Sequence, residues 1–171
     1  MSKDILKQDD GGVVLSARQV KIYTEHSTWS TRIGWFLRNN KKVFISTYSL
    51  PDVKYIKSMF GDLSLENVTI LAHRKFALQA AAIKFEYPEV SIFFEDNIHQ
   101  KCALCEPDTV IIGSANFGHS GWKELSVGLK SKGAYDILLS DYQSRLTQAV
   151  EGTVTEEQLK EYQEVKTKYQ S

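Results

Sequence analysis

The apolar positions of the chain follow two spacings, and each spacing predicts one kind of secondary structure. Short runs rich in β-branched and aromatic residues predict strands, whereas apolar residues recurring every three or four positions predict helices. The predicted strands span residues 19–24, 42–49, 68–72, 90–94, 98–105, 109–113, 124–129 and 134–139. One predicted helix begins at a cap formed by Ser27 or Thr28 and ends at Asn39, and three others span residues 51–60, 76–84 and 155–170.

The order of these elements predicts the fold class. Strands and helices alternate in the first half of the chain, which is typical of α/β proteins whose helices cover a central sheet. We therefore expect an α/β fold with a mixed β-sheet flanked by helices on both faces. The sequence shows no internal repeat and no linker-like segment, so residues 1–171 are predicted to form a single domain, with residues 1–12 flexible.

Charge and composition narrow the classes of function. The sequence has 21 basic and 21 acidic residues, so its formal net charge is zero. Binding of nucleic acid through overall charge alone is therefore disfavoured, although a local basic groove stays open as an alternative. The candidate clusters for contacts with phosphates are Lys41-Lys42 and Arg74-Lys75, which could rim a cleft.

Membrane insertion is also disfavoured. The sequence has no apolar run of the roughly 18 residues that a transmembrane helix needs. Residues 1–12 are polar and acidic and contain no apolar run suited to a signal peptide. These features predict a cytoplasmic protein with no stable membrane association.

The two cysteines, Cys102 and Cys105, have the C-x-x-C spacing of redox pairs and of half zinc sites. They fall in a predicted strand, where side chains three positions apart point to opposite faces. The sequence has no second pair of cysteines to complete a zinc site with four ligands. We therefore expect both to be thiols of the core, with no metal bound.

A group of polar residues gives the strongest functional signal in the sequence. His99 and Lys101 lie two positions apart on a predicted strand, so their side chains should point to the same face. A turn and a second predicted strand follow, and this strand ends at the sequence Gly113-Ser114-Ala115-Asn116. An imidazole, an ammonium, a hydroxyl and a carboxamide can therefore meet at one place, which suits the binding and attack of a phosphate group.

These residues, with Glu124 further along the chain, resemble the H-x-K…G-S-x-N signature, or HKD motif, of the phospholipase D superfamily. The strand predicted at residues 42–49 also resembles the early core strand of that family. The position where the family usually has Asp is Glu106 here, with Asp108 two residues further on. In the family this acid is mainly structural. One copy of the motif is present, whereas many members of the family carry two.

The resemblance implies a two-step hydrolysis of a phosphodiester that needs no metal or other cofactor. His99 would attack phosphorus and form a phosphohistidine, while a second histidine would protonate the leaving oxygen and then activate water. Lys101 and Asn116 would bind the nonbridging oxygens, Ser114 would line the same pocket, and Glu124 would orient a catalytic imidazole. Because one motif supplies one such histidine, the resemblance also implies a homodimer.

The substrate is predicted less directly, because the superfamily cleaves phospholipids, nucleic acids and related diesters. By size, the chain resembles small bacterial endonucleases with a single motif, so a nuclease is the first hypothesis. The alternatives are a lipid-directed phosphodiesterase or phosphatidyl transferase, and a catalytically inactive module that binds nucleic acid. His73 and His119 could also contact the substrate, although ordinary loop positions explain both residues without a functional role.

Overall fold

The computed structural model describes residues 17–24, 29–39, 41–61, 63–118 and 120–152, together with residues 155, 157, 160, 161 and 164. The strands are β1 (Gln19–Tyr23), β2 (Val43–Thr47), β3 (Val68–Ala72), β4 (Ser91–Phe94), β5 (Cys102–Cys105), β6 (Thr109–Gly113), β7 (Ser126–Lys130) and β8 (Val150–Glu151). The helices are α1 (Trp29–Arg38), α2 (Val53–Phe60), α3 (Ala77–Glu86) and α4 (Lys132–Leu146), with a short 3-10 helix at Arg74–Phe76. β3 and β6 have the predicted boundaries, whereas α2 begins two residues late because Asp52 caps it.

All of the described strands belong to one sheet, with the order β1-β7-β6-β5-β2-β3-β4-β8. β2, β3 and β4 run parallel to one another, whereas the other neighbouring strands are antiparallel. One edge of the sheet therefore gathers the carboxyl ends of β2, β3 and β6 and the amino ends of β5 and β7. This mixed sheet confirms the predicted fold class.

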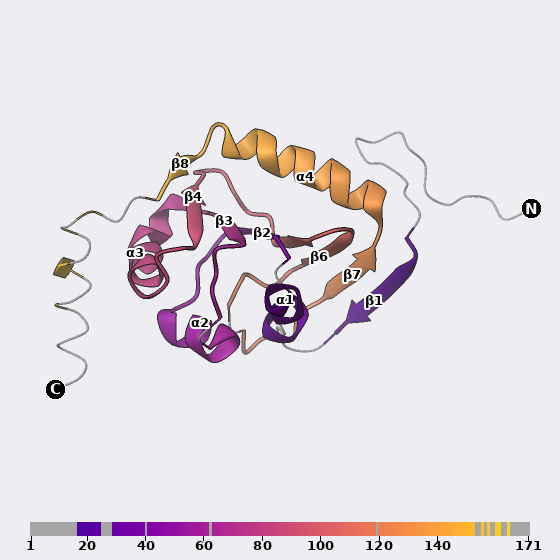
Figure 1. Ribbon diagram of the computed structural model, residues 1–171, viewed down its shortest axis with the longest axis horizontal. Helices are drawn as coiled ribbons and strands as arrows, with labels where there is room; N and C mark the ends of the chain where they lie inside the picture. The colour runs from indigo at the N-terminus through magenta and orange to yellow at the C-terminus, as the bar shows by residue number, and fades with distance from the viewer. Residues whose placement is uncertain are drawn as a thin grey trace, which may run out of the picture.

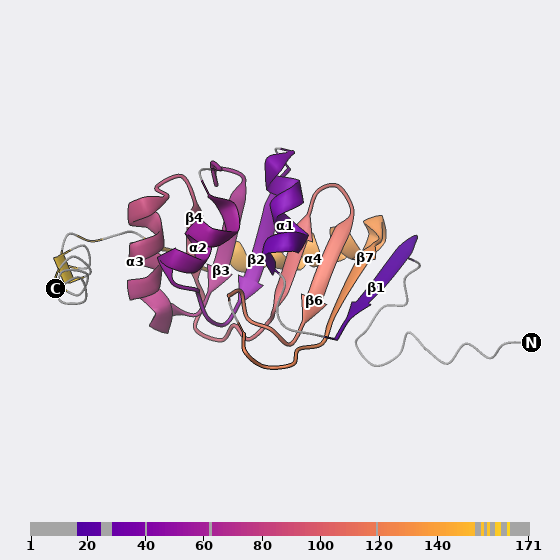
Figure 2. The same cartoon turned by 90° about the horizontal axis from the view of Figure 1, so that it is seen from below.

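Helices cover both faces of the sheet, as the sequence predicts. α4 runs along one face and α1, α2 and α3 lie on the other (Figure 1), and the view from below shows α1–α3 in front of the strands (Figure 2). Each face has its own buried core. Ile45 and Ile70 belong to the core under α1–α3, whereas Leu71, Leu104 and Tyr142 belong to the core under α4. Consecutive residues of a strand thus enter opposite cores.

The segment after β7 corrects one prediction, because α4 occupies the place of the strand predicted at residues 134–139. Ser131 caps this helix, since its side-chain oxygen accepts a hydrogen bond from the backbone N–H of Ala134. Tyr135 and Tyr142 then lie two helical turns apart and are both buried in the core under α4. The predicted strand covered a short apolar run, and the helical spacing becomes visible only over a longer stretch.

The strand predicted at residues 98–105 is shorter in the structure. β5 begins at Cys102, so His99 and Lys101 lie in the connection between β4 and β5. Cys102 pairs with Ser46 of β2 and Ile112 of β6, and both strands end one residue later, so most of the preceding segment lacks neighbouring strands that would continue the ladder. One backbone hydrogen bond reaches further, from the N–H of Gly113 to the carbonyl of Lys101 at 3.1 Å. Because His99 lies outside β5, the alternation of side chains along a strand does not determine the direction in which its side chain points.

Several predictions about the ends of the chain fall outside the described residues. Residues 1–12, predicted to be flexible, lie outside them, and so do Ser27 and Thr28. In the helix predicted at residues 155–170, residues 157, 160, 161 and 164 are described as helical. Among the described helices, none is long and apolar enough to cross a membrane.

Candidate active site

The predicted catalytic residues lie at the edge of the sheet where β2, β3 and β6 end and where β5 and β7 begin. His99 and Lys101 precede β5, Ser114 follows β6, and Glu124 precedes β7. Because β6 pairs in antiparallel fashion with both β5 and β7, the connection before β5 and the connection from β6 to β7 lie next to each other. The order of the strands in the sheet therefore gathers the site.

The side chains of His99 and Lys101 contact each other directly. The Nζ of Lys101 lies 3.2 Å from both the Nδ1 and the Nε2 of His99, and it donates a hydrogen bond to the His99 carbonyl at 2.8 Å. Partial burial lowers the pKa of Lys101 below its usual value, while the nearby Tyr48 and Glu124 oppose that shift. His99 is exposed. The site thus holds an amino group against an imidazole that a ligand can approach.

Two hydroxyl groups hold the carboxylate of Glu124. Ser114 donates a hydrogen bond to its Oε2, and Ser120 donates one to its Oε1 at 2.7 Å. The Oγ of Ser114 also accepts a hydrogen bond from the backbone N–H of Leu125 at 3.1 Å. Among the residues that the structure describes, no hydrogen bond joins Glu124 to His99. The action of Glu124 on an imidazole therefore stays a prediction.

The glycine of the motif allows β6 and β7 to approach closely. A Cβ added at Gly113 would lie 2.5 Å from the Cβ of Ser126 and 2.7 Å from the carbonyl oxygen of Leu125. A larger residue at this position would therefore push the two strands apart. The next residue, Ser114, donates its backbone N–H to the same Leu125 carbonyl at 3.0 Å. This close pairing fixes Ser114 beside the start of β7.

Two hollows meet at Ser114. The first is a groove of about 750 Å³, and its lining includes His99, Lys101 and Ser114. The second is a cavity of about 420 Å³, and its lining includes Ser114, Asn116 and Glu124. The Oδ1 of Asn116 is buried without a hydrogen-bond partner among the described residues. The structure therefore brings three of the predicted residues into one groove and places Asn116 and Glu124 in the adjoining cavity.

Tyr48 is a residue of the site that the sequence analysis missed. Its ring centroid lies 5.4 Å from that of His99 and 5.1 Å from that of His73. The Nζ of Lys75 lies 4.3 Å from the Tyr48 centroid, and the Nζ of Lys101 lies 5.9 Å from it. His73 is a loop residue, as expected, but it lies beside the site. The available signal was that Tyr48 directly follows a buried parallel strand, where binding sites commonly form.

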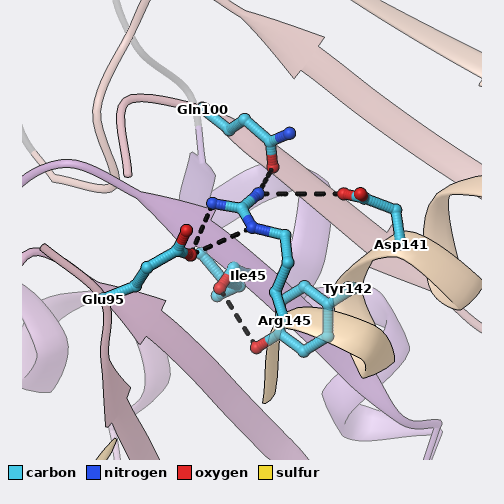
Figure 3. A network of polar contacts seen from close by, with 6 residues as sticks. All are labelled: Ile45, Glu95, Gln100, Asp141, Tyr142 and Arg145. Atoms are coloured by element: carbon cyan, nitrogen blue, oxygen red, sulfur yellow. Dashed lines mark hydrogen bonds and ion pairs between the residues drawn. The ribbon is translucent and has the colours of Figure 1, made fainter. Parts of the chain in front are cut away.

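Arg145, at the end of α4, was also missed, and it holds the segment that carries His99 and Lys101. Its Nε and Nη2 donate hydrogen bonds to the Oε2 of Glu95 at 2.9 and 2.6 Å. Its Nη1 donates a hydrogen bond to the side-chain oxygen of Gln100, the residue between the two predicted catalytic residues (Figure 3). The network therefore ties the connection between β4 and β5 to α4.

Comparison with solved structures identifies the fold. Nuc from Salmonella typhimurium, a phospholipase D family member, matches with a TM-score of 0.59 at 16% identity, over 78% of this chain and 98% of that chain. NucT from Helicobacter pylori matches with a TM-score of 0.52 at 15% identity, over 78% of this chain and 99% of that chain. The chain has a phospholipase D-like fold.

A third structure has the same phospholipase D-like arrangement over part of its length. TrmBL2, an archaeal chromatin protein whose structure shows a novel mode of DNA binding, matches with a TM-score of 0.52 at 10% identity. The match covers 83% of this chain and 56% of that chain. No protein-family model and no curated protein matches the sequence.

The turn between β5 and β6 lies at the opposite end of the phospholipase D-like sheet and contains both acids near the expected Asp position. Asp108 is 8% exposed and pairs with Arg18. Glu106 is half-buried, and its carboxylate accepts a hydrogen bond from the backbone N–H of Lys42 at 3.4 Å. Asp108 is therefore the buried acid of this turn. Lys41-Lys42 also lies at this end of β2, so the prediction that this cluster rims the cleft is wrong.

The cysteines of this phospholipase D-like fold are free thiols on opposite faces of β5, as predicted. Burial raises the pKa of Cys102 to about 12 and raises the pKa of Cys105 as well. A thiol that stays protonated is a poor nucleophile and a poor metal ligand. Within the described ranges, no group of three or more His, Cys, Asp and Glu residues could hold a metal ion.

Proposed function

We propose that this protein is a phosphodiesterase that hydrolyses nucleic acid by way of a phosphohistidine at His99. The observation that carries the proposal is the exposed His99 imidazole with the Lys101 amino group against it, in a groove that Ser114 also lines. A phosphate bound by protonated Lys101 would present its phosphorus to the imidazole. The phospholipase D-like fold supports the same chemistry.

The proposed reaction has two steps. In the first, an imidazole nitrogen of His99 attacks phosphorus, the bond to the leaving oxygen breaks, and a second histidine gives that oxygen its proton. In the second, the same second histidine takes a proton from water, which attacks phosphorus and releases His99. Lys101 and Asn116 stabilise the charge on the nonbridging oxygens, Ser114 lines the pocket, and Glu124 orients an imidazole.

The second histidine is proposed to be His99 of the partner subunit, in a homodimer whose twofold axis passes through the site. Exposed apolar side chains around the site support an interface there. Ile112 and Leu125 line the groove and are 42% and 58% exposed, and Trp122 lines the adjoining cavity and is 81% exposed. Exposed apolar side chains that gather in one region are a common mark of a surface that associates.

A lipid-directed phosphodiesterase is the second candidate, because much of the groove is apolar. Leu104, Ile112 and Val127 line it beside the motif residues, so an acyl chain could lie against them. Nucleic acid is preferred because a cation and an aromatic ring lie next to the motif residues. These are the amino group of Lys75 and the ring of Tyr48, which contact each other. Such side chains bind the phosphates and bases of a strand.

An assay in excess EDTA tests the proposal. The protein is incubated with single-stranded and duplex DNA and RNA, and in parallel with phosphatidylcholine vesicles. We expect nucleic acid to be cleaved in EDTA, because the proposed reaction uses imidazole and ammonium groups rather than a metal ion. We expect His99→Ala to abolish this cleavage.

Three other results would each contradict part of the proposal. Complete loss of activity in EDTA that magnesium or zinc restores would contradict the mechanism. Hydrolysis of phosphatidylcholine without cleavage of nucleic acid would favour the second candidate. Binding of nucleic acid without cleavage of any substrate would favour the inactive module.

A further inference from the structure

The edge of the sheet that carries the site continues past His99 to the ends of β2 and β3. These strands are parallel and pair Thr47 with Ala72, so Tyr48 and His73 follow as neighbours. The backbone N–H of His73 donates a hydrogen bond to the Tyr48 carbonyl at 3.3 Å, which fixes the two residues side by side. Polar and aromatic side chains beyond the motif therefore lie on the same edge as the motif.

The Tyr48 ring connects this group to the catalytic residues. The rings of His99 and His73 both contact it, with centroid distances of 5.4 and 5.1 Å. Two amino groups also contact it, the Nζ of Lys101 at 5.9 Å and the Nζ of Lys75 at 4.3 Å from the centroid. An anion bound at Lys75 would therefore lie against the same aromatic ring that the catalytic residues contact.

Local structure positions Lys75 and leaves its charge available. The Nδ1 of His73 accepts a hydrogen bond from the backbone N–H of Lys75 at 3.1 Å, which fixes the start of the 3-10 helix. The neighbouring Arg74 pairs with Asp96 at 2.9 Å. In the described part of the chain, no carboxylate pairs with Lys75, which is exposed. An exposed cation held over an aromatic ring without a carboxylate partner suits an anionic ligand.

We propose that Lys75, His73 and Tyr48 form a second subsite, which binds the phosphate next to the scissile one in a strand of nucleic acid. Lys75 neutralises that phosphate. Because the Nδ1 of His73 is an acceptor, its Nε2 carries a proton and donates a hydrogen bond. The ring of Tyr48 packs against the sugar or base between the two phosphates. This inference rests on the proposed function and narrows its substrate to a strand with at least two successive phosphodiesters.

Substrate length distinguishes the second subsite from the catalytic residues. A thymidine dinucleotide has one phosphodiester and a trinucleotide has two, so the trinucleotide alone can fill both subsites. We expect the wild type to cleave the trinucleotide with the higher kcat/KM. Lys75→Gln should reduce this advantage by roughly three- to tenfold, as for the loss of one phosphate contact.

Lys42→Gln is the matched control. It also removes one exposed lysine charge, but at the opposite end of β2, and it should leave the advantage of the trinucleotide unchanged. Thermal melting of both variants checks that they fold. An equal loss on the two substrates in Lys75→Gln would overturn the second subsite. A reduction of the trinucleotide advantage in Lys42→Gln as large as that in Lys75→Gln would also overturn it.

Binding measured without cleavage keeps this test independent of the reaction. The affinity for a single-stranded oligothymidylate is measured against salt concentration in a His99→Ala background. Lys75→Gln should reduce the slope of log affinity against log salt by about 0.7, the value for one phosphate contact on a single strand, and Lys42→Gln should not. His73→Asn keeps an acceptor for the Lys75 N–H and should weaken binding less than Lys75→Gln.

The two readouts separate the possible failures. An unchanged salt slope in Lys75→Gln would overturn the second subsite even if the wild type cleaves nucleic acid. A reduced slope in a protein that cleaves no substrate would support the subsite and overturn the proposed reaction.

Discussion

The β5–β6 hairpin carries polar side chains at both of its ends, and the two ends differ in how these side chains are paired. At the turn, Asp108 is buried and pairs with Arg18. At the open end, His99 and Ser114 are exposed. There the amino group of Lys101 contacts an imidazole and a backbone carbonyl. The acid of the turn is buried in an ion pair, whereas His99 and Ser114 at the open end are exposed to solvent, although Ser114 also forms hydrogen bonds with Glu124 and Leu125.

The difference separates groups that stabilise the fold from groups that are available to a ligand. The Asp108 carbonyl also accepts a hydrogen bond from the backbone N–H of Ser131 at 2.9 Å, which ties the turn to the start of α4. Lys101 instead loses solvation, and this lowers its pKa. Partly buried groups with a perturbed pKa are characteristic of active sites. We therefore propose that the open end is the functional end of the hairpin and that the turn is structural.

Substitutions at the two ends should have opposite effects. His99→Ala should lower activity by many orders of magnitude and barely change the melting temperature, because the exposed imidazole contributes little to the core. Asp108→Ala should remove roughly 1–3 kcal/mol from the free energy of unfolding, because it deletes a buried carboxylate that pairs with the Arg18 guanidinium. The folded fraction of Asp108→Ala should keep its kcat. Enzyme assays and urea unfolding of both variants measure these effects.

Lys101→Ala extends the comparison at the functional end. It should also cripple turnover, because the phosphate would lose a point charge in both binding and the transition state. His99→Ala with more than a small fraction of the wild-type rate would show that the site is wrongly assigned. If Asp108→Ala had normal stability but no activity, Asp108 would be needed for the reaction rather than for the fold.

The same hairpin shows what the sequence could and could not predict. The boundaries of β6 were predicted correctly because turn residues limit its apolar run at both ends. The motif residues were found because the identity and spacing of residues such as His99 and Lys101 are local properties of the sequence. The extension of β5 to His99 was wrong, because the length of a strand depends on where its neighbours end. That information comes from segments far away in the sequence.

The missed residues have a similar explanation. Tyr48 was predicted inside the strand at residues 42–49, but β2 ends one residue before it, and Arg145 lay outside the predicted elements. Their contacts with the segment around Gln100 form only when β2, β5 and α4 pack together. A sequence pattern can place such residues on an element, but it does not contain the packing that brings them to the site.

Arg145 also lies at the functional end, where its side chain is mostly buried and is paired within the chain. Its side chain is 18% exposed and binds Glu95 and Gln100. Arg145→Met should lower kcat by about tenfold, because Gln100 would no longer hold His99 and Lys101 in place. It should also cost roughly 1–3 kcal/mol of unfolding free energy. Steady-state kinetics and urea unfolding measure the two effects.

Two further variants show whether Arg145 acts through Gln100. Lys132→Met breaks an exposed ion pair with Asp136 near the other end of α4, and it should cost less than about 1 kcal/mol and leave kcat unchanged. Gln100→Ala should lower kcat, and adding Arg145→Met to it should lower kcat little further. Full additivity of the two losses in kcat would show that Arg145 does not act through Gln100.

The prediction with the smallest expected effect concerns whether a second copy of the chain completes the proposed active site at the functional end. In the proposed dimer each reaction needs two His99 residues, so a mixed dimer of wild-type and His99→Ala chains would be inactive. After equal amounts are mixed and re-equilibrated, activity per chain should be roughly one quarter of the wild-type value, since about a quarter of the dimers then have both imidazoles. Sedimentation should give twice the chain mass of 19.4 kDa at micromolar concentration.

Asp108→Ala chains are the matched control, because a substitution at the structural end should leave the activity of mixed dimers near that of the wild type. A loss strictly proportional to the added His99→Ala chains, or a fully active monomer, would mean that each chain carries a complete site.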